Sequence, residues 1–302
     1  MIMKLATTTG DFGRYAKNQE ECVRYIHQAG FKYIDYNFGF DYARGIGAFA
    51  DDWQEQMQHL RAVADELGVK FVQSHAPMGK PIVQGPDYIP FIEVNKRCIE
   101  CCAILGIDRV VVHSGYEYGL TKEECFKRNK DFYMELLPLA QEKGVYVLTE
   151  NFNKMHKEGV FWIDNATDLR ALLDCVDHPY FHAVWDAGHA NMQEMPQDEE
   201  LRIVGEHVYA LHIQDNMGDH DSHVFPYLGT MSLDAVMNGL KDIGYKGYFT
   251  FESNIFLPGD KRRQSERGDK LLNAPLSVRL KAEELLYEIG KSTLEAYGCF
   301  EE

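Results

Sequence analysis

Short apolar segments alternate with longer amphipathic segments along the chain. The short ones are nearly continuous apolar runs, which are typical of parallel strands buried on both faces. They span residues 4–9, 31–38, 69–77, 108–115, 145–151, 181–189, 208–215 and 247–254. Helical patterns span residues 18–30, 51–67, 90–105, 121–143, 165–176, 198–205, 232–244 and 276–297. Eight strand–helix alternations predict an α/β protein, a single (β/α)8 TIM barrel domain over residues 1–302.

Helix boundaries are marked by capping residues. Thr121 opens the sequence TKEE, a capping box, and Asn165 and Ser232 are expected to cap the starts of two other helices. Two segments lack a clear periodicity. Residues 38–49, aromatic and glycine-containing, are expected to form a loop, and residues 257–275 a polar loop before the final helix.

Composition restricts the class of partner. The net charge of −16 argues against nucleic acid and against an acidic membrane surface. No apolar stretch has the length of a membrane span, and the N-terminus lacks the features of a secretory signal. Seven cysteines, an odd number, favour buried thiols in a reducing cytoplasm over a disulfide framework.

Four strands end on a side chain that can bind a metal. These residues are Glu150, Asp186, His212 and Glu252. The C-terminal ends of barrel strands converge on one face, so the four are expected to form one site. Carboxylates gathered there without a cation would repel one another, which favours a divalent ion. Two glutamates, an aspartate and a histidine suit manganese, with magnesium, cobalt and zinc as alternatives.

Further candidates surround this set. They are His75, His113, His189, Asp221 and His223, each of which fits either an additional metal ligand or a group that hydrogen-bonds substrate. For His75 and His113, a buried histidine tied to a neighbouring carboxylate is an alternative. Loop aromatics could contact the apolar face of a sugar. These are Tyr36, Phe38, Trp53, Tyr116, Tyr118, Phe152 and Trp162.

An ordered set of motifs resembles the xylose-isomerase-like TIM barrel superfamily. The motifs are SHAP, VVVHSG, LTENF, WDAGHANM, LHIQDN, LGTM and TFESN. The superfamily includes sugar phosphate isomerases and epimerases, ketose 3-epimerases and AP endonuclease family 2. Resemblance to the epimerases implies that Glu150, Asp186, His212 and Glu252 bind one ion. It also implies that His189 contacts a substrate hydroxyl, and that the chain forms a homo-oligomer.

The resemblance implies an isomerase or epimerase acting on a small carbohydrate, phosphorylated or not. Glu150 and Glu252 would exchange protons with the substrate through a metal-stabilised enediolate. Epimerases usually carry an arginine in the loop after the metal-binding histidine, and QDNMGDHDSH has none. In the endonucleases, all nine candidate positions have counterparts, which implies a multi-zinc phosphodiesterase instead. A lyase or deglycosidase on a sugar, using the same enediolate chemistry, is a third alternative.

Overall fold

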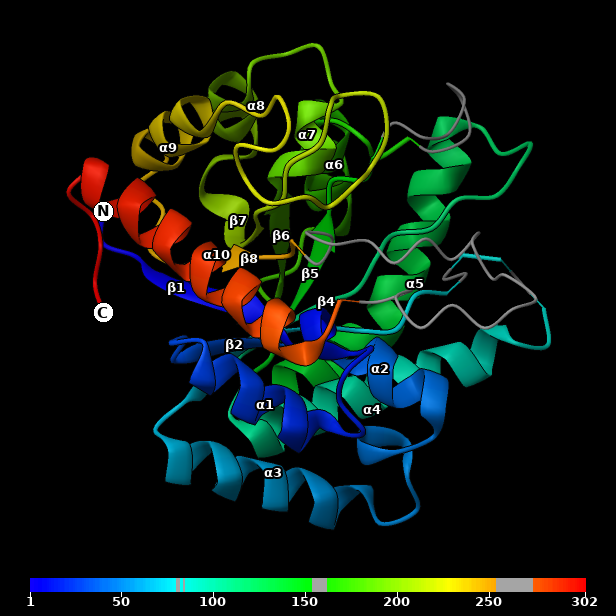
Figure 1. Ribbon diagram of the computed structural model, residues 1–302. Coiled ribbons are helices and arrows are strands. Elements are labelled where there is room, and N and C mark those ends of the chain that lie inside the picture. The colour runs from blue at the N-terminus through cyan, green and yellow to red at the C-terminus, as the bar shows by residue number, and fades with distance from the viewer. Residues whose placement is uncertain (80–81, 84, 154–161, 254–273) are drawn as a thin grey trace, which may run out of the picture.

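Eight parallel strands form the centre of the protein, in the order β7-β6-β5-β4-β3-β2-β1-β8. The computed structural model describes residues 1–79, 82–83, 85–153, 162–253 and 274–302 (Figure 1). The strands are β1 (Lys4–Thr8), β2 (Tyr33–Asn37), β3 (Lys70–His75), β4 (Arg109–Val111), β5 (Tyr146–Glu150), β6 (Phe181–Asp186), β7 (Val208–His212) and β8 (Tyr248–Phe251). All eight predicted strands are therefore present, and the predicted fold is confirmed.

The sheet closes on itself just beyond β7. Ile213 forms a parallel bridge with Phe251 of β8. Its amide donates to the Thr250 carbonyl at 2.8 Å, and its carbonyl accepts from the Glu252 amide at 3.0 Å. This closure places the end of β8 beside the ends of β7 and β1, which is what brings Glu252 to the same mouth as His212.

Helices surround the barrel (Figure 1). They are α1 (Gln19–Gln28), α2 (Phe38–Arg44), α3 (Trp53–Leu67), α4 (Tyr88–Leu105), α5 (Lys122–Lys143), α6 (Ala166–Val176), α7 (Ala187–Asn191), α8 (Gln197–Val204), α9 (Leu233–Asp242) and α10 (Leu276–Ala296). The predicted caps are confirmed: Thr121 and Glu124 form the capping box, and Asn165 and Ser232 cap α6 and α9. Of the expected polar loop 257–275, residues 257–273 lie outside the described part of the chain.

The prediction of a loop at residues 38–49 is wrong, because this segment contains helix α2 and a 3-10 turn at Gly47–Phe49. The Asn37 side chain accepts a hydrogen bond from the Phe40 amide at 3.3 Å and so caps α2. Gly45 then ends this helix in the left-handed conformation, with φ of 62°. The strand expected over residues 181–189 ends at Asp186, and a second short helix, α7, follows because the Asp186 carboxylate caps it.

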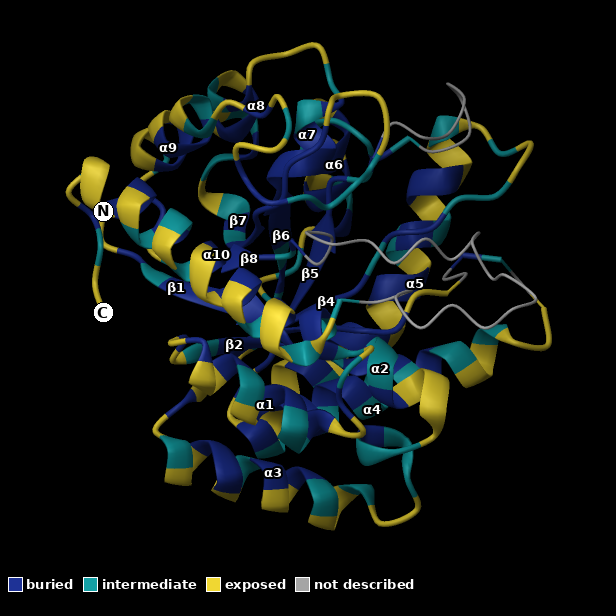
Figure 2. Cartoon of the chain, viewed as in Figure 1, coloured by how far each residue is buried: buried dark blue, intermediate teal, exposed yellow. Residues whose placement is uncertain are grey.

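The core has two layers, and the strands are buried on both faces (Figure 2). The larger layer packs the outer face of the barrel against the helices, whose exposed residues face outward. The smaller layer lies inside the barrel and comprises Val111, Leu148, Val184 and Ala210. These apolar side chains fill part of the barrel below its mouth, and the metal-capable residues lie at or just beyond the strand ends. Among the described residues, no helix is long and apolar enough to cross a membrane.

Candidate metal and active site

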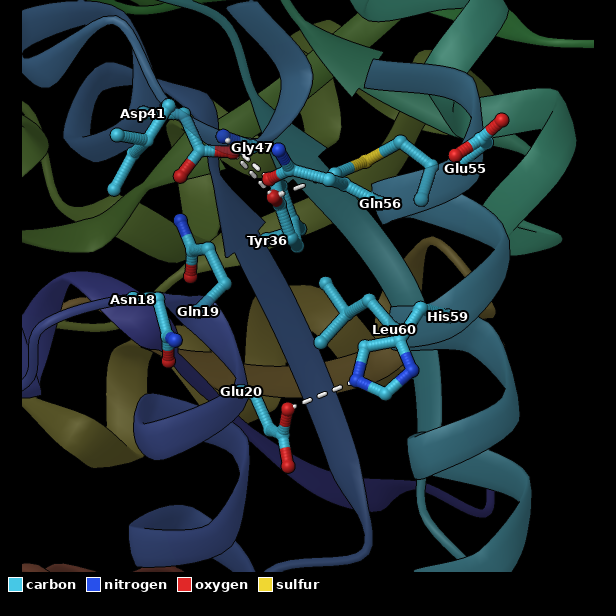
Figure 3. A pocket seen from close by; sticks show the side chains of 12 residues that line it. Asn18, Gln19, Glu20, Tyr36, Asp41, Gly47, Glu55, Gln56, His59 and Leu60 are labelled. Atoms are coloured by element: carbon cyan, nitrogen blue, oxygen red, sulfur yellow. Dashed lines mark hydrogen bonds and ion pairs between the residues drawn. The ribbon is translucent and has the colours of Figure 1, made fainter. Parts of the chain in front are cut away.

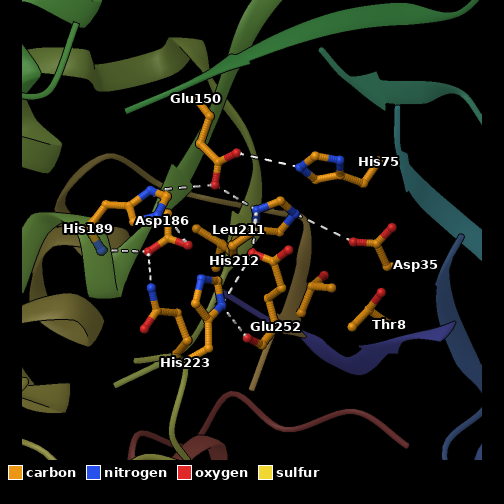
Figure 4. Close-up of polar contacts among 12 residues, drawn as sticks. Thr8, Asp35, His75, Glu150, Asp186, His189, Leu211, His212, His223 and Glu252 are labelled. Atoms are coloured by element: carbon orange, nitrogen blue, oxygen red, sulfur yellow. Dashed lines mark hydrogen bonds and ion pairs between the residues drawn. The ribbon is translucent and has the colours of Figure 1, made fainter. Parts of the chain in front are cut away.

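The four strand-end residues meet at the mouth of the barrel (Figure 4). Glu150, Asp186 and His212 are the last residues of β5, β6 and β7, and Glu252 directly follows β8. Each offers one ligand atom, and these atoms all lie within 4.8 Å of one another. We call Glu150, Asp186, His212 and Glu252 the inner group.

His212 lies between the two glutamates. Its Nδ1 atom is 2.8 Å from Glu150 Oε1 and 3.3 Å from Glu252 Oε2, and the side chain is fully buried. Burial lowers the pKa of His212, but Glu252 and Glu150 outweigh it and hold this pKa well above its ordinary value. One imidazole nitrogen therefore faces two carboxylates, an arrangement that is stable only with a proton or a metal ion between them.

Glu150 also belongs to a second cluster of ligand atoms, with His75 and His113. Its Oε2 atom lies 2.7 Å from His113 Nε2 and 3.8 Å from His75 Nε2. His75 ends β3, as expected, whereas His113 lies two residues beyond the end of β4. Burial raises the pKa of Glu150, but His212 and His113 lower it by more, so that this pKa lies well below its ordinary value.

The two histidines of this second cluster face each other. His75 Nδ1 donates to the Ala76 carbonyl at 2.7 Å, which leaves its Nε2 without that proton. This Nε2 is 3.0 Å from His113 Nε2. Two nitrogen atoms at this separation need a proton or a cation between them, so His75, His113 and Glu150 form a second metal-capable group.

His189, Asp221 and His223 form a third cluster, which we call the outer group. Asp221 lies 3.2 Å from His189 Nε2 through one oxygen and 3.2 Å from His223 Nε2 through the other. Backbone carbonyls fix both rings: His189 Nδ1 donates to Asn151 at 2.7 Å, and His223 Nδ1 donates to Glu252 at 2.9 Å. Both Nε2 atoms therefore point at Asp221.

Charge dominates the outer group. Burial lowers the pKa of each histidine, but nearby carboxylates outweigh it and raise both pKa values to about 10. The main opposing groups are Asp186 for His189 and Asp221 for His223. For Asp221, burial raises the pKa, and the hydrogen bonds from His189 and His223 reverse the shift, so this pKa lies below its ordinary value. The group is thus a set of opposite charges held at the barrel mouth.

Three buried polar residues at the site were missed by sequence reasoning. Asp35 on β2 lies 3.4 Å from His212 Nε2. The Asn151 side chain accepts from the Asp186 amide and donates to the Asp186 carbonyl, both at 2.8 Å. Gln214 contacts Asp186 and Asp221. Asn151 and Gln214 follow predicted ligands by one and two positions, which is a usable sequence signal, whereas Asp35 lies inside a strand.

The inner group fits a divalent metal ion. Asp186 Oδ2 is buried and has no hydrogen-bond partner, although Asp186 Oδ1 accepts from the His189 amide at 2.6 Å. Burial raises the pKa of Asp186 to about 7, even though His189 opposes the shift. An unsatisfied carboxylate oxygen beside two further carboxylates and an imidazole is the donor set that a cation such as Mn²⁺ would complete.

Three of the seven aromatic residues expected to contact substrate differ in where they lie. Phe152 lies at the site, with its ring centroid 5.6 Å from that of His113 and 5.7 Å from that of His189. Tyr36 and Phe38 pack against each other at 4.6 Å and are fully buried. The expectation that these two contact substrate is therefore wrong. Tyr36 lies on β2 next to Asp35, and neighbouring strand residues point to opposite sides.

A separate cleft of about 420 Å³ lies outside the barrel, between α1 and α3 (Figure 3). Tyr36 lies in its wall and donates a hydrogen bond to Asp41 at 2.6 Å. Glu20 and His59 pair across it at 3.0 Å. None of the metal-capable groups found among the described residues lies in this cleft, so we place the chemistry at the barrel mouth.

Comparison with known proteins supports the same architecture. Residues 23–268 match the family model described as xylose isomerase-like TIM barrel. A solved structure of L-ribulose 3-epimerase superimposes with a TM-score of 0.74 at 16% identity, covering 98% of this chain and 95% of that one. At this identity, the likeness concerns the fold alone.

Two curated relatives share local sequence. The uncharacterised protein MJ1311 of Methanocaldococcus jannaschii is 29% identical over 167 residues, covering 54% of this chain and 56% of its own length. The fructoselysine 3-epimerase of Escherichia coli O157:H7 is 30% identical over 118 residues, covering 39% of this chain and 42% of its own length. The matched region thus spans about half the length of these relatives.

Proposed function

The chain belongs to the xylose isomerase-like TIM barrel family, and from this we propose that it is a divalent-metal-dependent isomerase or epimerase of a sugar or sugar phosphate. The observation that carries the proposal is the pair of carboxylates, from Glu150 and Glu252, that both face His212 Nδ1. Proton abstraction and return need two such groups. The names of two similar proteins, L-ribulose 3-epimerase and fructoselysine 3-epimerase, support the same class of reaction.

Glu150, Asp186, His212 and Glu252 would hold the ion. When bound there, the ion would supply electrophilic stabilisation of negative charge on two neighbouring substrate oxygens. Mn²⁺ suits a site with three carboxylates and one imidazole, and Mg²⁺, Co²⁺ and Zn²⁺ are alternatives.

The chain's own residues would move the protons. Glu150, whose pKa is well below its ordinary value, is ionised at neutral pH and can accept the proton from the carbon beside the substrate carbonyl. The carbon–hydrogen electron pair then forms the carbon–carbon double bond of an enediolate. Glu252, in its protonated form, delivers its proton from the other side to the same carbon, which inverts it, or to the neighbouring carbon, which isomerises the sugar when the hydroxyl proton moves to the former carbonyl oxygen. Exchange with solvent then removes the proton from Glu150 and returns one to Glu252.

Other residues would hold the substrate. The positive charges of His189 and His223 at the barrel mouth would favour a substrate hydroxyl or phosphate beside them, and Phe152 lies between His113 and His189 as a wall for the apolar face of the sugar. His75 and His113 would orient Glu150 or bind a further ion. The free, largely buried cysteines suit a cytoplasmic enzyme.

Solvent deuterium exchange tests this function. The Mn²⁺-loaded protein is incubated in D2O with a panel of ketoses, ketose phosphates and keto-glycosides, and NMR follows the hydrogen beside the carbonyl. We expect exchange on at least one substrate, and a loss of about 10²–10⁴-fold in Glu150→Gln and in Glu252→Gln. Glu55→Gln, an exposed carboxylate of α3, serves as the control. Exchange that survives in either active-site variant would refute the proton-transfer roles.

A second candidate is a multi-zinc phosphodiesterase resembling the apurinic-site endonucleases. The observation in its favour is that the inner, second and outer groups are contiguous and share Glu150 between two of them. Metal analysis of zinc-loaded protein distinguishes the candidates: three zinc ions per chain, together with cleavage of abasic DNA, would support the nuclease. The net charge of −16 opposes binding of DNA.

Elimination is a third outcome of the same enediolate chemistry. A substrate with a leaving group beside the carbanion would lose it in place of reprotonation, which makes the protein a lyase or deglycosidase. Mass spectrometry of the exchange reactions would then show an unsaturated product or a released aglycone. Such a product would retain the roles of Glu150 and the inner group but replace the isomerase assignment.

A further inference from the structure

Gln214 connects the inner and outer groups. It lies two residues after His212, just beyond the end of β7, and is fully buried. Its amide nitrogen donates to Asp186 Oδ1 at 3.2 Å and to Asp221 Oδ1 at 2.9 Å. A primary amide has two N–H donors, so one side chain satisfies one carboxylate in each group.

The Gln214 side chain packs directly against Gly188. A Cβ atom at Gly188 would lie 2.0 Å from Gln214 Cδ, so any side chain at position 188 would displace it. Gly188 lies between the two groups in the chain, two residues after Asp186 and one before His189. The backbone of α7 and the Gln214 side chain therefore fit together only because residue 188 is glycine.

Among the described residues, one other partner of Asp221, His189, also hydrogen-bonds Asp186, but it does so through its backbone amide at 2.6 Å. Asn153 Nδ2 donates to Asp221 Oδ2 at 3.0 Å, and His223 contacts Asp221 Oδ1. His189 touches both groups, but its ring contact with Asp186 Oδ2 is 3.8 Å, longer than a hydrogen bond. Gln214 is thus the side chain that hydrogen-bonds directly to both carboxylates among the contacts described here.

We propose that Gln214 is a positioning residue, which fixes Asp221 against Asp186 and so sets the distance between the metal-capable inner group and the substrate-facing outer group. The kinetic part of this inference rests on the proposed function, whereas the metal-binding part does not. A neutral donor is required at this position, because a third carboxylate would repel Asp186 and Asp221, and an apolar side chain would remove one hydrogen bond from each.

The test compares Gln214→Met with Gln197→Met. Methionine keeps the approximate volume and removes the amide. Gln197 is a matched control: it is also buried and lies close by, but its amide donates to the Ala187 carbonyl at 2.8 Å and contacts no carboxylate. Calorimetric titration of metal-free protein with Mn²⁺ is the first measurement. We expect Mn²⁺ to bind at least about tenfold more weakly to Gln214→Met, as for other groups that orient metal ligands. The Mn²⁺ affinity of Gln197→Met should fall less than threefold.

The second measurement separates positioning from simple loss of metal. At saturating Mn²⁺, with whichever substrate shows exchange, Gln214→Met is expected to raise KM more than it lowers kcat. In an Asp221→Asn background the same substitution should change KM less than twofold, because its effect on KM acts through Asp221. Equal Mn²⁺ affinity in Gln214→Met and Gln197→Met, or an undiminished effect in the Asp221→Asn background, would overturn the inference.

The role of Gln214 can still be tested if the variant does not fold or if no sugar is turned over. If Gln214→Met does not fold, Gln214→Glu retains the shape and is titrated instead, and native Mn²⁺ affinity in that variant would reject the need for a neutral donor. If no sugar is turned over, the Mn²⁺ titration alone decides the role of Gln214, while the absence of exchange counts against the proposed function.

Discussion

Asp35 Oδ2 lies 3.4 Å from His212 Nε2, on the side of the imidazole away from Glu150 and Glu252 (Figure 4). Asp35 is itself held by Gln73, whose amide donates to the same oxygen at 3.0 Å. A carboxylate facing one nitrogen favours the proton there and leaves the other nitrogen free for a metal ion. Asp35 therefore favours the tautomer of His212 that can bind metal through Nδ1.

Replacing Asp35 by Asn should weaken metal binding while preserving the fold. The amide lacks the negative charge that holds the His212 Nε2 proton, so we expect Mn²⁺ affinity to fall about 10–100-fold in calorimetric titration. Asp41→Asn is the control, since Asp41 is an equally buried carboxylate that lies outside the barrel. A Mn²⁺ affinity within twofold of the native protein would show that Asp35 does not orient His212.

Asp35 also shows why part of the site escapes sequence analysis. Glu150, Asp186 and His212 could be predicted because each ends its strand, and the ends of parallel strands converge whatever the details of packing. Which side of a strand a residue faces depends on a shift of one position, so Tyr36 was expected at the site, whereas its neighbour Asp35 lies there.

Helix α2 and the Gln214 contacts depend on tertiary detail of a similar kind. The aromatic, glycine-containing composition of residues 38–49 resembles a loop, and only the Asn37 cap and the left-handed Gly45 define the helix. The position of Gln214 depends on room beside Gly188, about 26 residues earlier in the chain. No periodicity in either segment reports these contacts.

Glu200 should make stability depend on pH. It is buried on α8 with one oxygen unpaired, and burial raises its pKa from about 4.5 to about 8. The folded state therefore holds this proton more tightly than the unfolded state. Its contribution is fully present below pH 4.5 and is lost as the pH rises toward 8, by at most about 5 kcal/mol.

Urea unfolding of the native protein and Glu200→Gln, at pH 5 and pH 8.5 in EDTA, measures this effect. The glutamine is neutral in both states, so the variant should gain stability relative to the native protein as the pH rises. Glu199→Gln, a carboxylate on the exposed side of the same helix, should show no such gain. A native-to-variant difference that is constant across this range would contradict the shift.

Asp215 should hold the loop that carries Asp221 and His223. Its carboxylate is buried and accepts from the backbone amides of Asn216, Gly229 and Met231, at 2.8, 3.0 and 2.9 Å. Its backbone pairs with Val224. In Asp215→Asn the new NH2 group faces backbone donors, so we expect a loss of about 1–3 kcal/mol in unfolding free energy.

Hydrogen exchange measured by mass spectrometry locates the effect of this change. Amide protection in residues 216–231 should fall before protection elsewhere in Asp215→Asn. Asp219→Asn changes an exposed carboxylate of the same loop, which contacts His220, and should leave protection intact. Uniform loss of protection over the whole chain would show that Asp215 supports the fold in general and not this loop.

The Asp186 carboxylate should lower the stability of the metal-free protein and raise that of the metal-loaded protein. Mn²⁺ at a hundred times its Kd should stabilise the native protein by about 2.7 kcal/mol, seen as a rise in Tm that EDTA reverses. Asp186→Asn removes a buried charge whose pKa is raised to about 7 and retains a good helix cap, so its metal-free Tm at pH 8 should equal or exceed the native value. The same variant should lose most of the Mn²⁺-induced rise.

Asp164→Asn, a carboxylate outside the three groups, should keep this rise. A full Mn²⁺ response in Asp186→Asn would exclude Asp186 as a ligand, and a lower metal-free Tm would show that its charge is already compensated by the protein.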